Sequence, residues 1–328
     1  MYNYILGGDC MATAEHLKNL IKAHIDRDDE KFKTVVLQIA AYEARQNHEG
    51  LARELKLLVE KSVSKVSILR PNIQNPMLSI SMPAEKLSDL VVSEDTLERI
   101  KRILSEYRNK NKLQKYGLSN RRKILIEGNP GTGKTFTASV IASELGLPLY
   151  TVQMDKVVTK FMGETSAKLR QVFDSISLST GVYFFDEFDA IGADRNLDNE
   201  VGEARRILNS FFQFIEQDAS ESIIIAATNN QKLLDQALFR RFDDVLHYEL
   251  PTEREIRRLF EKQIVPFDKN FVVTSKLISK ATSLSQAEII RVCEDAIKNA
   301  ILSNLAITED GLISLINERM SAYSKKEA

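Results

Sequence analysis

The sequence has few cysteines, no long apolar run and no excess of charge of either sign. Its two cysteines, Cys10 and Cys293, are too few and too far apart for a disulfide framework or a zinc knuckle, so we expect two ordinary buried thiols. The densest apolar run, Ile223 to Ala227, has the length of a strand and falls well short of the ~18 residues that span a bilayer. We therefore expect no membrane span.

The charge balance weighs against a main role on nucleic acid. Lys and Arg number 45 and Asp and Glu 46, which gives a net charge of -1, whereas proteins that grip a phosphate backbone carry a basic surface. Hydrophobic residues make up 43% and charged residues 28% of 328 residues, a composition typical of globular protein with room for two or three domains. The first eight residues lack the basic and apolar stretches of an export signal, so we expect a cytoplasmic location.

The chain falls into four parts. Residues 1–62 carry apolar side chains at helical spacing, which predicts a bundle of three amphipathic helices. Residues 63–84 hold three of the seven prolines and are predicted to be a linker. From 85 to 250, short β-type runs alternate with helical ones, which favours a parallel sheet flanked by helices. Residues 251–328 are helical, with capping-box starts at Thr252 and Ser285, and should form a small α domain.

The motif from Gly128 to Thr135 satisfies G-x-x-x-x-G-K-[ST], directly after a predicted strand and before a predicted helix. In such a loop, backbone N–H groups turn around a polyphosphate, Lys134 neutralises the phosphate oxygens and the Thr135 hydroxyl ligates Mg²⁺. The motif therefore predicts binding of ATP with Mg²⁺. The expected nucleotide-binding residues are Asn129, Pro130, Gly131, Thr132, Gly133, Lys134, Thr135 and Phe136.

Two acidic residues follow the apolar run from Val182 to Phe185. Parallel strands bring their carboxyl ends to one edge of the sheet, so Asp186 and Glu187 should arrive beside the phosphate loop. Asp186 would then join Thr135 at the magnesium ion, and Glu187 would accept a proton from the attacking water. The alternative is an acidic turn at the end of a strand.

With these motifs, the chain from about Ala84 onward resembles the AAA+ ATPases, specifically the AAA branch that contains protein-remodelling motors. The resemblance implies an α/β P-loop module with a C-terminal α-helical lid. It makes Asn229, at the end of the run Ile223–Ala227, the sensor 1 residue that positions water against the γ-phosphate. It places Val91 beside the adenine.

The same resemblance assigns Arg240 and Arg241 as arginine fingers that reach a neighbouring subunit's γ-phosphate. Many relatives separate these arginines by Pro-Gly, which this chain lacks, so which of the two touches the phosphate stays open; a solvated surface pair is the alternative. Ala287 stands where other AAA+ branches carry a sensor 2 arginine, and this supports the AAA branch. Arg205 and Arg206 stand at the start of a predicted helix, where arginines of relatives lie near the subunit interface; a role on the helix surface is the alternative.

The segment Lys160, Phe161, Met162 and Gly163 resembles the pore loop of AAA translocases. An aromatic residue on a glycine-hinged loop can hold a polypeptide without choosing its sequence. A buried Phe-Met pair is the alternative. An acidic stretch from Asp194 to Glu203 would line the same pore or be a solvated connection.

The resemblance as a whole implies an ATPase that forms a homo-oligomeric ring, with six subunits expected, and remodels or threads a polypeptide client. The N-terminal bundle would then bind the client or a partner. One alternative is a nucleotide-controlled assembly switch that acts on a dedicated partner, for example a separately encoded peptidase. A nucleic-acid motor is a further alternative, against which the charge balance stands.

Overall fold

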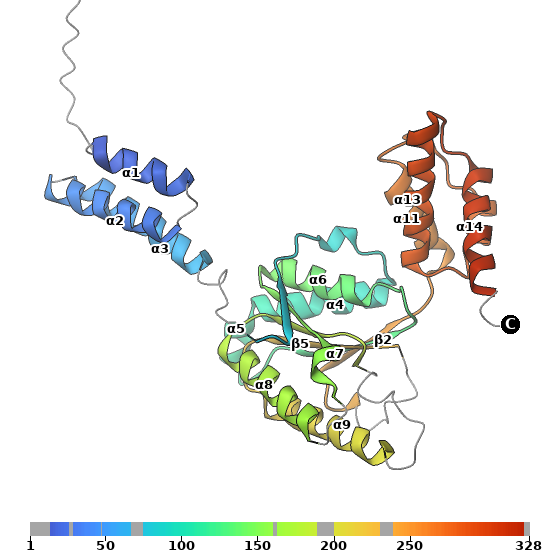
Figure 1. Cartoon of the computed structure of the whole chain (residues 1–328), viewed down its shortest axis with the longest axis horizontal. Coiled ribbons are helices and arrows are strands. Elements are labelled where there is room, and N and C mark those ends of the chain that lie inside the picture. Colours follow the sequence, from blue (N-terminus) through green and yellow to red (C-terminus); the bar gives the residue numbers. More distant parts are fainter. Residues whose placement is uncertain are drawn as a thin grey trace, which may run out of the picture. The chain divides into compact units, whose positions relative to one another are not determined.

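The computed structural model of the chain describes residues 14–25, 29–46, 48–66, 75–159, 163–188, 200–229 and 239–324 (Figure 1). The chain divides into two compact units, Met1–Asn72 and Ile73–Ala328. The larger unit contains the sheet, the phosphate loop and the C-terminal helices. All the residues predicted to bind the nucleotide lie within this unit.

The N-terminal unit is helical, as the apolar spacing predicts. Its helices are α1 (Ala14–Ile25), α2 (Asp29–Arg45) and α3 (Glu49–Val66), and α2 packs against both others. Among its described residues the core is small and contains Ala23, Val35, Ile39 and Ala40. The buried carboxylate of Glu43 meets His48 Nδ1 at 2.8 Å. Because α3 runs to Val66, the helical bundle extends past residue 62.

The larger unit is built on a six-stranded sheet among the described residues, with strand order β1-β3-β4-β5-β2-β6. The strands are β1 (Leu78–Ser81), β2 (Lys123–Gly128), β3 (Leu149–Val152), β4 (Val182–Phe185), β5 (Ile223–Thr228) and β6 (Asp244–Tyr248). The strands from β2 to β6 run parallel, as predicted. Strand β1 pairs antiparallel with β3 at the edge of the sheet. The predicted linker from 63 to 84 is therefore wrong over β1, which belongs to the folded sheet.

Helices cover both faces of the sheet (Figure 1). On one face lie α4 (Glu94–Arg108) and α6 (Lys134–Leu145), and on the other lie α8 (Glu164–Leu178) and α9 (Glu200–Gln217). Successive side chains of a strand point to opposite faces, so Leu125 packs with α8 and α9 while Ile124 packs with α4 and α6. Shorter helical segments are η1 (Leu87–Asp89), α5 (Lys110–Gln114) and α7 (Met154–Val157).

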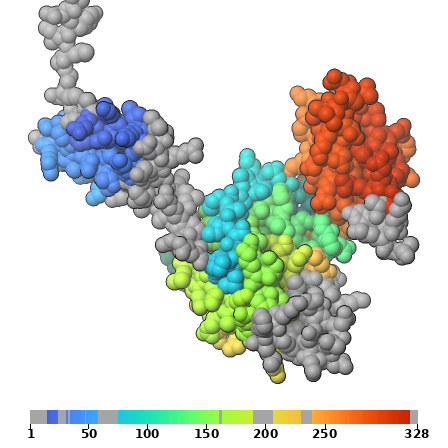
Figure 2. Space-filling model, viewed as in Figure 1, coloured from blue at the N-terminus to red at the C-terminus, as the bar shows by residue number. Residues whose placement is uncertain are grey.

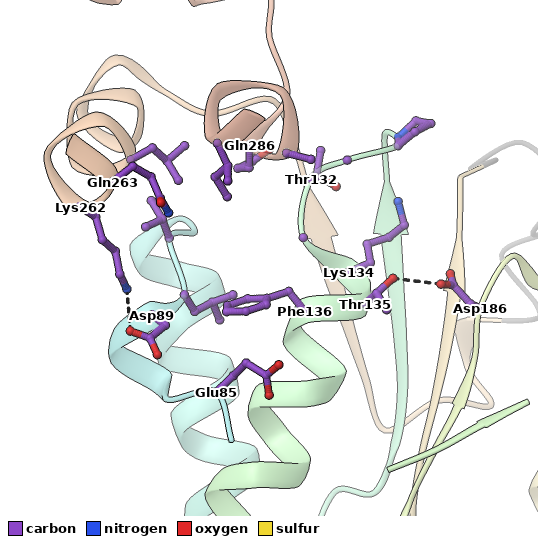
Figure 3. A pocket seen from close by; sticks show the side chains of 18 of the residues that line it. Glu85, Asp89, Thr132, Lys134, Thr135, Phe136, Asp186, Lys262, Gln263 and Gln286 are labelled. Carbon is purple, nitrogen blue, oxygen red and sulfur yellow. Dashed lines mark hydrogen bonds and ion pairs between the residues drawn. The ribbon is translucent and has the colours of Figure 1, made fainter. Parts of the chain in front are cut away.

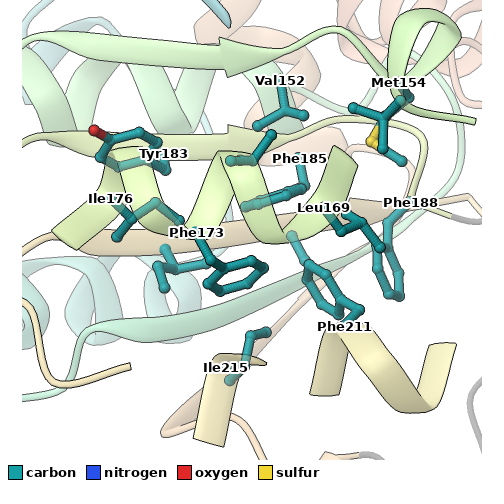
Figure 4. Close-up of a cluster of buried hydrophobic side chains, with 14 of the residues drawn as sticks. Val152, Met154, Leu169, Phe173, Ile176, Tyr183, Phe185, Phe188, Phe211 and Ile215 are labelled. Atoms are coloured by element: carbon teal, nitrogen blue, oxygen red, sulfur yellow. The ribbon is translucent and has the colours of Figure 1, made fainter. Parts of the chain in front are cut away.

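Aromatic side chains fill the core between the sheet and α8 and α9. Figure 4 shows Phe185 from β4, Phe173 from α8 and Phe211 from α9 meeting in one cluster. The Phe185 and Phe211 rings lie edge to face with their centroids 5.1 Å apart, an arrangement that the ring quadrupoles favour. This packing holds β4 in the sheet, and the end of β4 carries the acidic pair Asp186 and Glu187.

The C-terminal helices, called the lid here, have a core of their own. They are α11 (Glu253–Ile264), α12 (Ser275–Lys280), α13 (Gln286–Ser303) and α14 (Glu309–Ser324). They form the orange to red lobe in Figure 2. Reciprocal capping boxes start α11 at Thr252 and α13 at Ser285, as predicted. Val91, which precedes α4, is buried in the lid core, so this residue ties the lid to the sheet part of the unit.

Candidate nucleotide site

The phosphate loop connects the end of β2 to the start of α6. Gly133 caps the N-terminus of α6 with φ 101°, a backbone conformation that side chains with a Cβ rarely adopt. A Cβ built on Gly133 would meet no atom of the described residues within 4 Å, apart from Gly133 and its neighbours along the chain. The loop therefore leaves an open cradle at a helix N-terminus, which is the geometry that suits a phosphate.

Lys134 lies at the bottom of this cradle, 7% exposed. Its Nζ donates to the backbone oxygens of Gly128, at 2.8 Å, and Asn129, at 2.9 Å, and to Asn229 Oδ1 at 2.7 Å. Asn129 O also accepts from the Thr132 hydroxyl at 2.8 Å. The ammonium group is thus held at the edge of the sheet where β2 and β5 end.

Thr135 and Asp186 come from different segments and meet at the mouth of the loop. Thr135 Oγ1 donates to Asp186 Oδ2 over 2.9 Å, the contact drawn at the right of Figure 3. A hydroxyl beside a carboxylate is the oxygen donor set that Mg²⁺ takes from proteins next to phosphate oxygens. The residues present therefore fit a magnesium ion.

Glu187 has an unusual backbone conformation. Its φ is 50°, and its N–H donates to Asp186 Oδ1 over 2.9 Å. Within the described residues, Asn304, at the C-terminal cap of α13, is the other non-glycine residue with positive φ. Such backbone strain costs of order 1–3 kcal/mol and gathers at functional sites. Glu187 is exposed to solvent on the cavity wall.

A cavity of about 710 Å³ joins these residues to the lid. Its phosphate end is lined by Pro130 to Phe136 together with Asp186, Glu187 and Asn229, and Val91 lies on the wall as well. Every predicted nucleotide-binding residue except Asn129 therefore reaches this cavity, and Asn129 contributes its backbone oxygen to Lys134. The volume suits a small-molecule ligand.

The far end of the cavity holds residues that no sequence motif identified. Lys262 of α11 donates to Asp89 Oδ1 at 2.9 Å and to the Ser88 carbonyl at 2.8 Å, which joins the lid to η1 (Figure 3). The hydrogen bond from Lys262 lowers the pKa of Asp89 below its ordinary value, so the carboxylate stays charged. Glu85 and Gln263 line the same end. Lys262 and Asp89 are 173 positions apart in the sequence, so no local sequence pattern predicts their ion pair.

The two arginines assigned as fingers do not line this cavity. Arg240 is exposed, whereas Arg241 contacts Glu216 at 3.4 Å and lies over the Phe212 ring with its guanidinium carbon 5.5 Å from the ring centre. Arg206 is exposed on α9. Neither arginine therefore lines the cavity of its own chain, and their role as fingers stays a prediction.

The pore-loop prediction falls mostly outside the described residues. Lys160, Phe161 and Met162 lie outside them, as does most of the acidic stretch from Asp194 to Glu203. Gly163 is described, with φ 82°, and begins α8 as its N-cap. The grip on a polypeptide therefore stays a prediction.

Comparison with known proteins identifies the family. The family model for "ATPase family associated with various cellular activities (AAA)" matches residues 124–250. The AAA family ATPase y4kL of Sinorhizobium fredii, described as uncharacterized, is 34% identical over 304 residues, 89% of this chain and 90% of the relative. A 26S proteasome regulatory subunit homolog of Methanothermobacter marburgensis is 30% identical over 223 residues, 66% of this chain and 58% of the relative. The ATP-dependent zinc metalloprotease FtsH of Parabacteroides distasonis is 30% identical over 217 residues, 63% of this chain and 32% of the relative.

The chain therefore belongs to the AAA family of ATPases, and its enzymatic activity is ATP hydrolysis. It spans nearly all of the Sinorhizobium relative, but less than two thirds of the proteasome-related and FtsH relatives. Among the described residues, no helix is both long and apolar enough to cross a membrane.

Proposed function

We propose that ATP binds in the cavity with its phosphates in the loop from Gly128 to Thr135, and that Thr135 and Asp186 hold Mg²⁺. The observation that carries the proposal is the 2.9 Å hydrogen bond between these two side chains, because it brings the phosphate loop and the acidic end of β4 to one point. When bound, the magnesium ion would neutralise charge on the phosphate oxygens. Lys134 would add its own positive charge after exchanging one of its present acceptors for a phosphate oxygen.

Within this site, Glu187 takes a proton from the attacking water. Its exposed carboxylate on the cavity wall supports the role, as does the strained backbone that fixes its direction. The Asn229 amide, held at the end of β5, orients that water. The adenine would lie toward Val91, which lines the same cavity.

The neighbouring subunit of a ring, with six subunits expected, completes the site with Arg240 or Arg241. Arg240 is exposed and neither arginine lines the cavity of its own chain, and both facts support an action in trans. A planar guanidinium that is always charged suits the transition-state phosphate, and a finger supplied by a neighbour accelerates hydrolysis by roughly a thousandfold or more.

Hydrolysis in the ring drives remodelling of a polypeptide client, which Phe161 and its neighbours grip and the N-terminal bundle recruits. Likeness to a proteasome regulatory subunit homolog and to FtsH supports a client that is a protein. A nucleotide-controlled assembly switch on a dedicated partner, which needs no threading, is the second candidate.

Nucleotide binding and hydrolysis are tested on the purified full chain with two variants of the site. Lys134→Ala should lose ATP affinity, because the buried ammonium that meets the phosphates is gone. Glu187→Gln should bind ATP with Mg²⁺, fail to hydrolyse it and accumulate as a ring, which native mass spectrometry detects. Tight ATP binding by Lys134→Ala, or wild-type turnover by Glu187→Gln, would refute the assignment. A pull-down with Glu187→Gln then identifies the retained client protein.

A further inference from the structure

Two buried hydroxyl groups form a connected pair behind the phosphate loop. The Tyr248 side chain, on β6, is 4% exposed, and its hydroxyl oxygen lies 2.5 Å from the hydroxyl oxygen of Thr137, which is buried near the start of α6. The Thr137 hydroxyl in turn donates to the Gly133 carbonyl over 3.0 Å. The two side chains thus connect a strand at the edge of the sheet to the start of the helix that follows the loop.

The direction of both hydrogen bonds follows from the number of protons. A hydroxyl group has one proton to donate, and Thr137 gives its proton to the Gly133 carbonyl. The contact between the two hydroxyls therefore uses the proton of Tyr248, with Thr137 Oγ1 as the acceptor. Burial raises the pKa of Tyr248 above its ordinary value, so the phenol keeps this proton. Because hydrogen bonds in a chain polarise one another, the bond from Tyr248 strengthens the bond from Thr137 to Gly133.

The backbone of Tyr248 contacts the other end of the phosphate loop. Tyr248 is paired with Gly128 in the parallel register of β6 and β2. A Cβ built on Gly128 would stand 2.1 Å from the Tyr248 carbonyl oxygen and 2.7 Å from the Tyr248 Cβ, so this approach requires glycine. One residue of β6 therefore holds the loop both where it leaves β2 and, through Thr137, where it enters α6.

The Gly133 carbonyl controls the direction of a backbone donor in the loop. This carbonyl accepts the Thr137 N–H over 2.9 Å as well as the Thr137 hydroxyl, so it is held inside the helix. A peptide group is planar and trans, and its C=O and N–H point in opposite directions. The N–H of Lys134, which belongs to the same peptide group, therefore points out of the helix N-terminus toward the cradle. Gly133 has no side chain to restrict its rotation, so this direction depends on what holds its carbonyl.

We propose that Tyr248 is a positioning residue of the ATP site: through the Thr137 hydroxyl it holds the Gly133 carbonyl, and it thereby directs the Lys134 N–H at a phosphate of the bound nucleotide. The inference rests on the proposed function and adds a residue to it. Tyr248 lies behind the loop and does not line the cavity. The Lys134 N–H would meet the phosphate in substrate and transition state alike, so loss of its orientation should raise KM and leave kcat nearly unchanged.

Three substitutions isolate the two hydroxyls. Tyr248→Phe removes the donor and keeps the buried ring, whereas Thr137→Val removes the other hydroxyl and keeps the branched shape of the side chain. Thr137→Ser keeps the hydroxyl and is the conservative variant. Each single removal leaves one buried polar atom without its partner, which costs stability. The double variant of Tyr248→Phe and Thr137→Val removes both partners and should recover much of that loss.

Tyr183 provides the matched control. Its side chain is fully buried on β4, and its hydroxyl donates to the backbone oxygens of Ser175 and Ser179 over 3.0 and 2.9 Å (Figure 4). It packs on the face of the sheet that α8 and α9 cover, whereas Tyr248 packs on the face that α6 covers. Tyr183→Phe therefore makes the same chemical change at a similar depth away from the phosphate loop. It should lower stability and leave ADP affinity and KM unchanged.

The probes are ADP with Mg²⁺ for affinity, steady-state ATP hydrolysis for KM and kcat, and denaturant unfolding without nucleotide for stability. Tyr248→Phe and Thr137→Val should each bind ADP about three- to tenfold more weakly, the range that one net hydrogen bond implies, and should raise KM for ATP to a similar extent. The double variant should bind ADP no more weakly than Thr137→Val alone, because both changes break the same connection. Thr137→Ser should bind ADP more tightly than Thr137→Val.

A merely structural role predicts a different result. Loss of stability alone would lower kcat through the smaller fraction of folded enzyme, leave KM unchanged and be reversed in the double variant. The inference is overturned if Tyr248→Phe binds ADP as tightly as Tyr183→Phe does, or if the double variant regains wild-type affinity together with its stability. A wild-type chain that binds neither ADP nor ATP overturns the proposed function itself, so the wild-type measurement distinguishes the two failures.

Discussion

Lys134 Nζ and Asn229 Oδ1 lie 2.7 Å apart, although one residue begins α6 and the other follows β5. The two strands that carry them, β2 and β5, are neighbours in the parallel sheet, so their carboxyl ends meet at one edge. The contact places a neutral amide beside the ammonium that should meet the phosphates. Lys134 thereby orients the Asn229 amide. Substitutions at position 229 should therefore affect either hydrolysis or ATP binding.

The first prediction concerns Asn229. Asn229→Ala should lower kcat by about a hundredfold while ATP still binds, because loss of one oriented polar group at a transition state costs this much. Asn229→Asp should instead weaken ATP binding, since a carboxylate pairs more strongly with Lys134 and repels phosphate. Steady-state kinetics and a fluorescent nucleotide titration separate the two effects. An alanine variant with wild-type kcat would remove Asn229 from the mechanism.

The second prediction concerns the arginines. Arg241 already contacts Glu216 and Phe212 within its own chain, whereas Arg240 is exposed, so Arg240→Ala should cause the larger loss of turnover. We expect a fall of roughly a thousandfold at ATP concentrations that saturate the site.

Mixed rings test whether the arginine acts in trans. Subunits of Arg240→Ala have an intact pocket, and subunits of Lys134→Ala have an intact arginine. Mixing the two inactive proteins should restore part of the turnover at those interfaces that join one good pocket to one good finger. No recovery at any ratio, in rings shown by native mass spectrometry to contain both variants, would speak against action across an interface.

Much of the fold is readable from the sequence, and β1 shows why the rest is not. Strands β4 and β5 are apolar runs of strand length, and both lie where that pattern predicts them. Strand β1 has four residues, three of them largely exposed, between Pro76 and Pro83. Its position depends on pairing with β3, and local composition carries no information about such a distant partner.

The candidate site divides in the same way. Two local patterns predict one end of the cavity: glycines and a lysine at fixed spacing from Gly128 to Thr135, and an acidic pair directly after an apolar run. Hydrogen bonds from the Ala287 N–H to the Gly131 carbonyl and from Lys262 to Asp89 join residues far apart in sequence. Val91 also packs into the lid core from outside the C-terminal helices, and no local motif records any of these contacts.

The third prediction follows from the burial of Cys293. This thiol is fully buried in the lid core, and burial raises its pKa to about 12. The reactive thiolate is therefore scarce at pH 8. In a Cys10→Ser variant, a chromogenic disulfide reagent should leave Cys293 unmodified while the chain is folded and modify it after denaturant is added. Rapid labelling of the native variant would show that the lid opens far more often than its packed core implies.

The fourth prediction separates threading from an assembly switch. Phe161→Ala should abolish processing of a client identified with the Glu187→Gln variant, because the alanine side chain cannot wedge against a polypeptide. Phe161→Tyr keeps an aromatic side chain and should retain processing. Client unfolding is followed by fluorescence of a labelled client with ATP and Mg²⁺, and ring assembly is measured in the same samples. If Phe161→Ala assembles and processes the client as fast as Phe161→Tyr does, hydrolysis times the release of a partner, and no aromatic grip is needed.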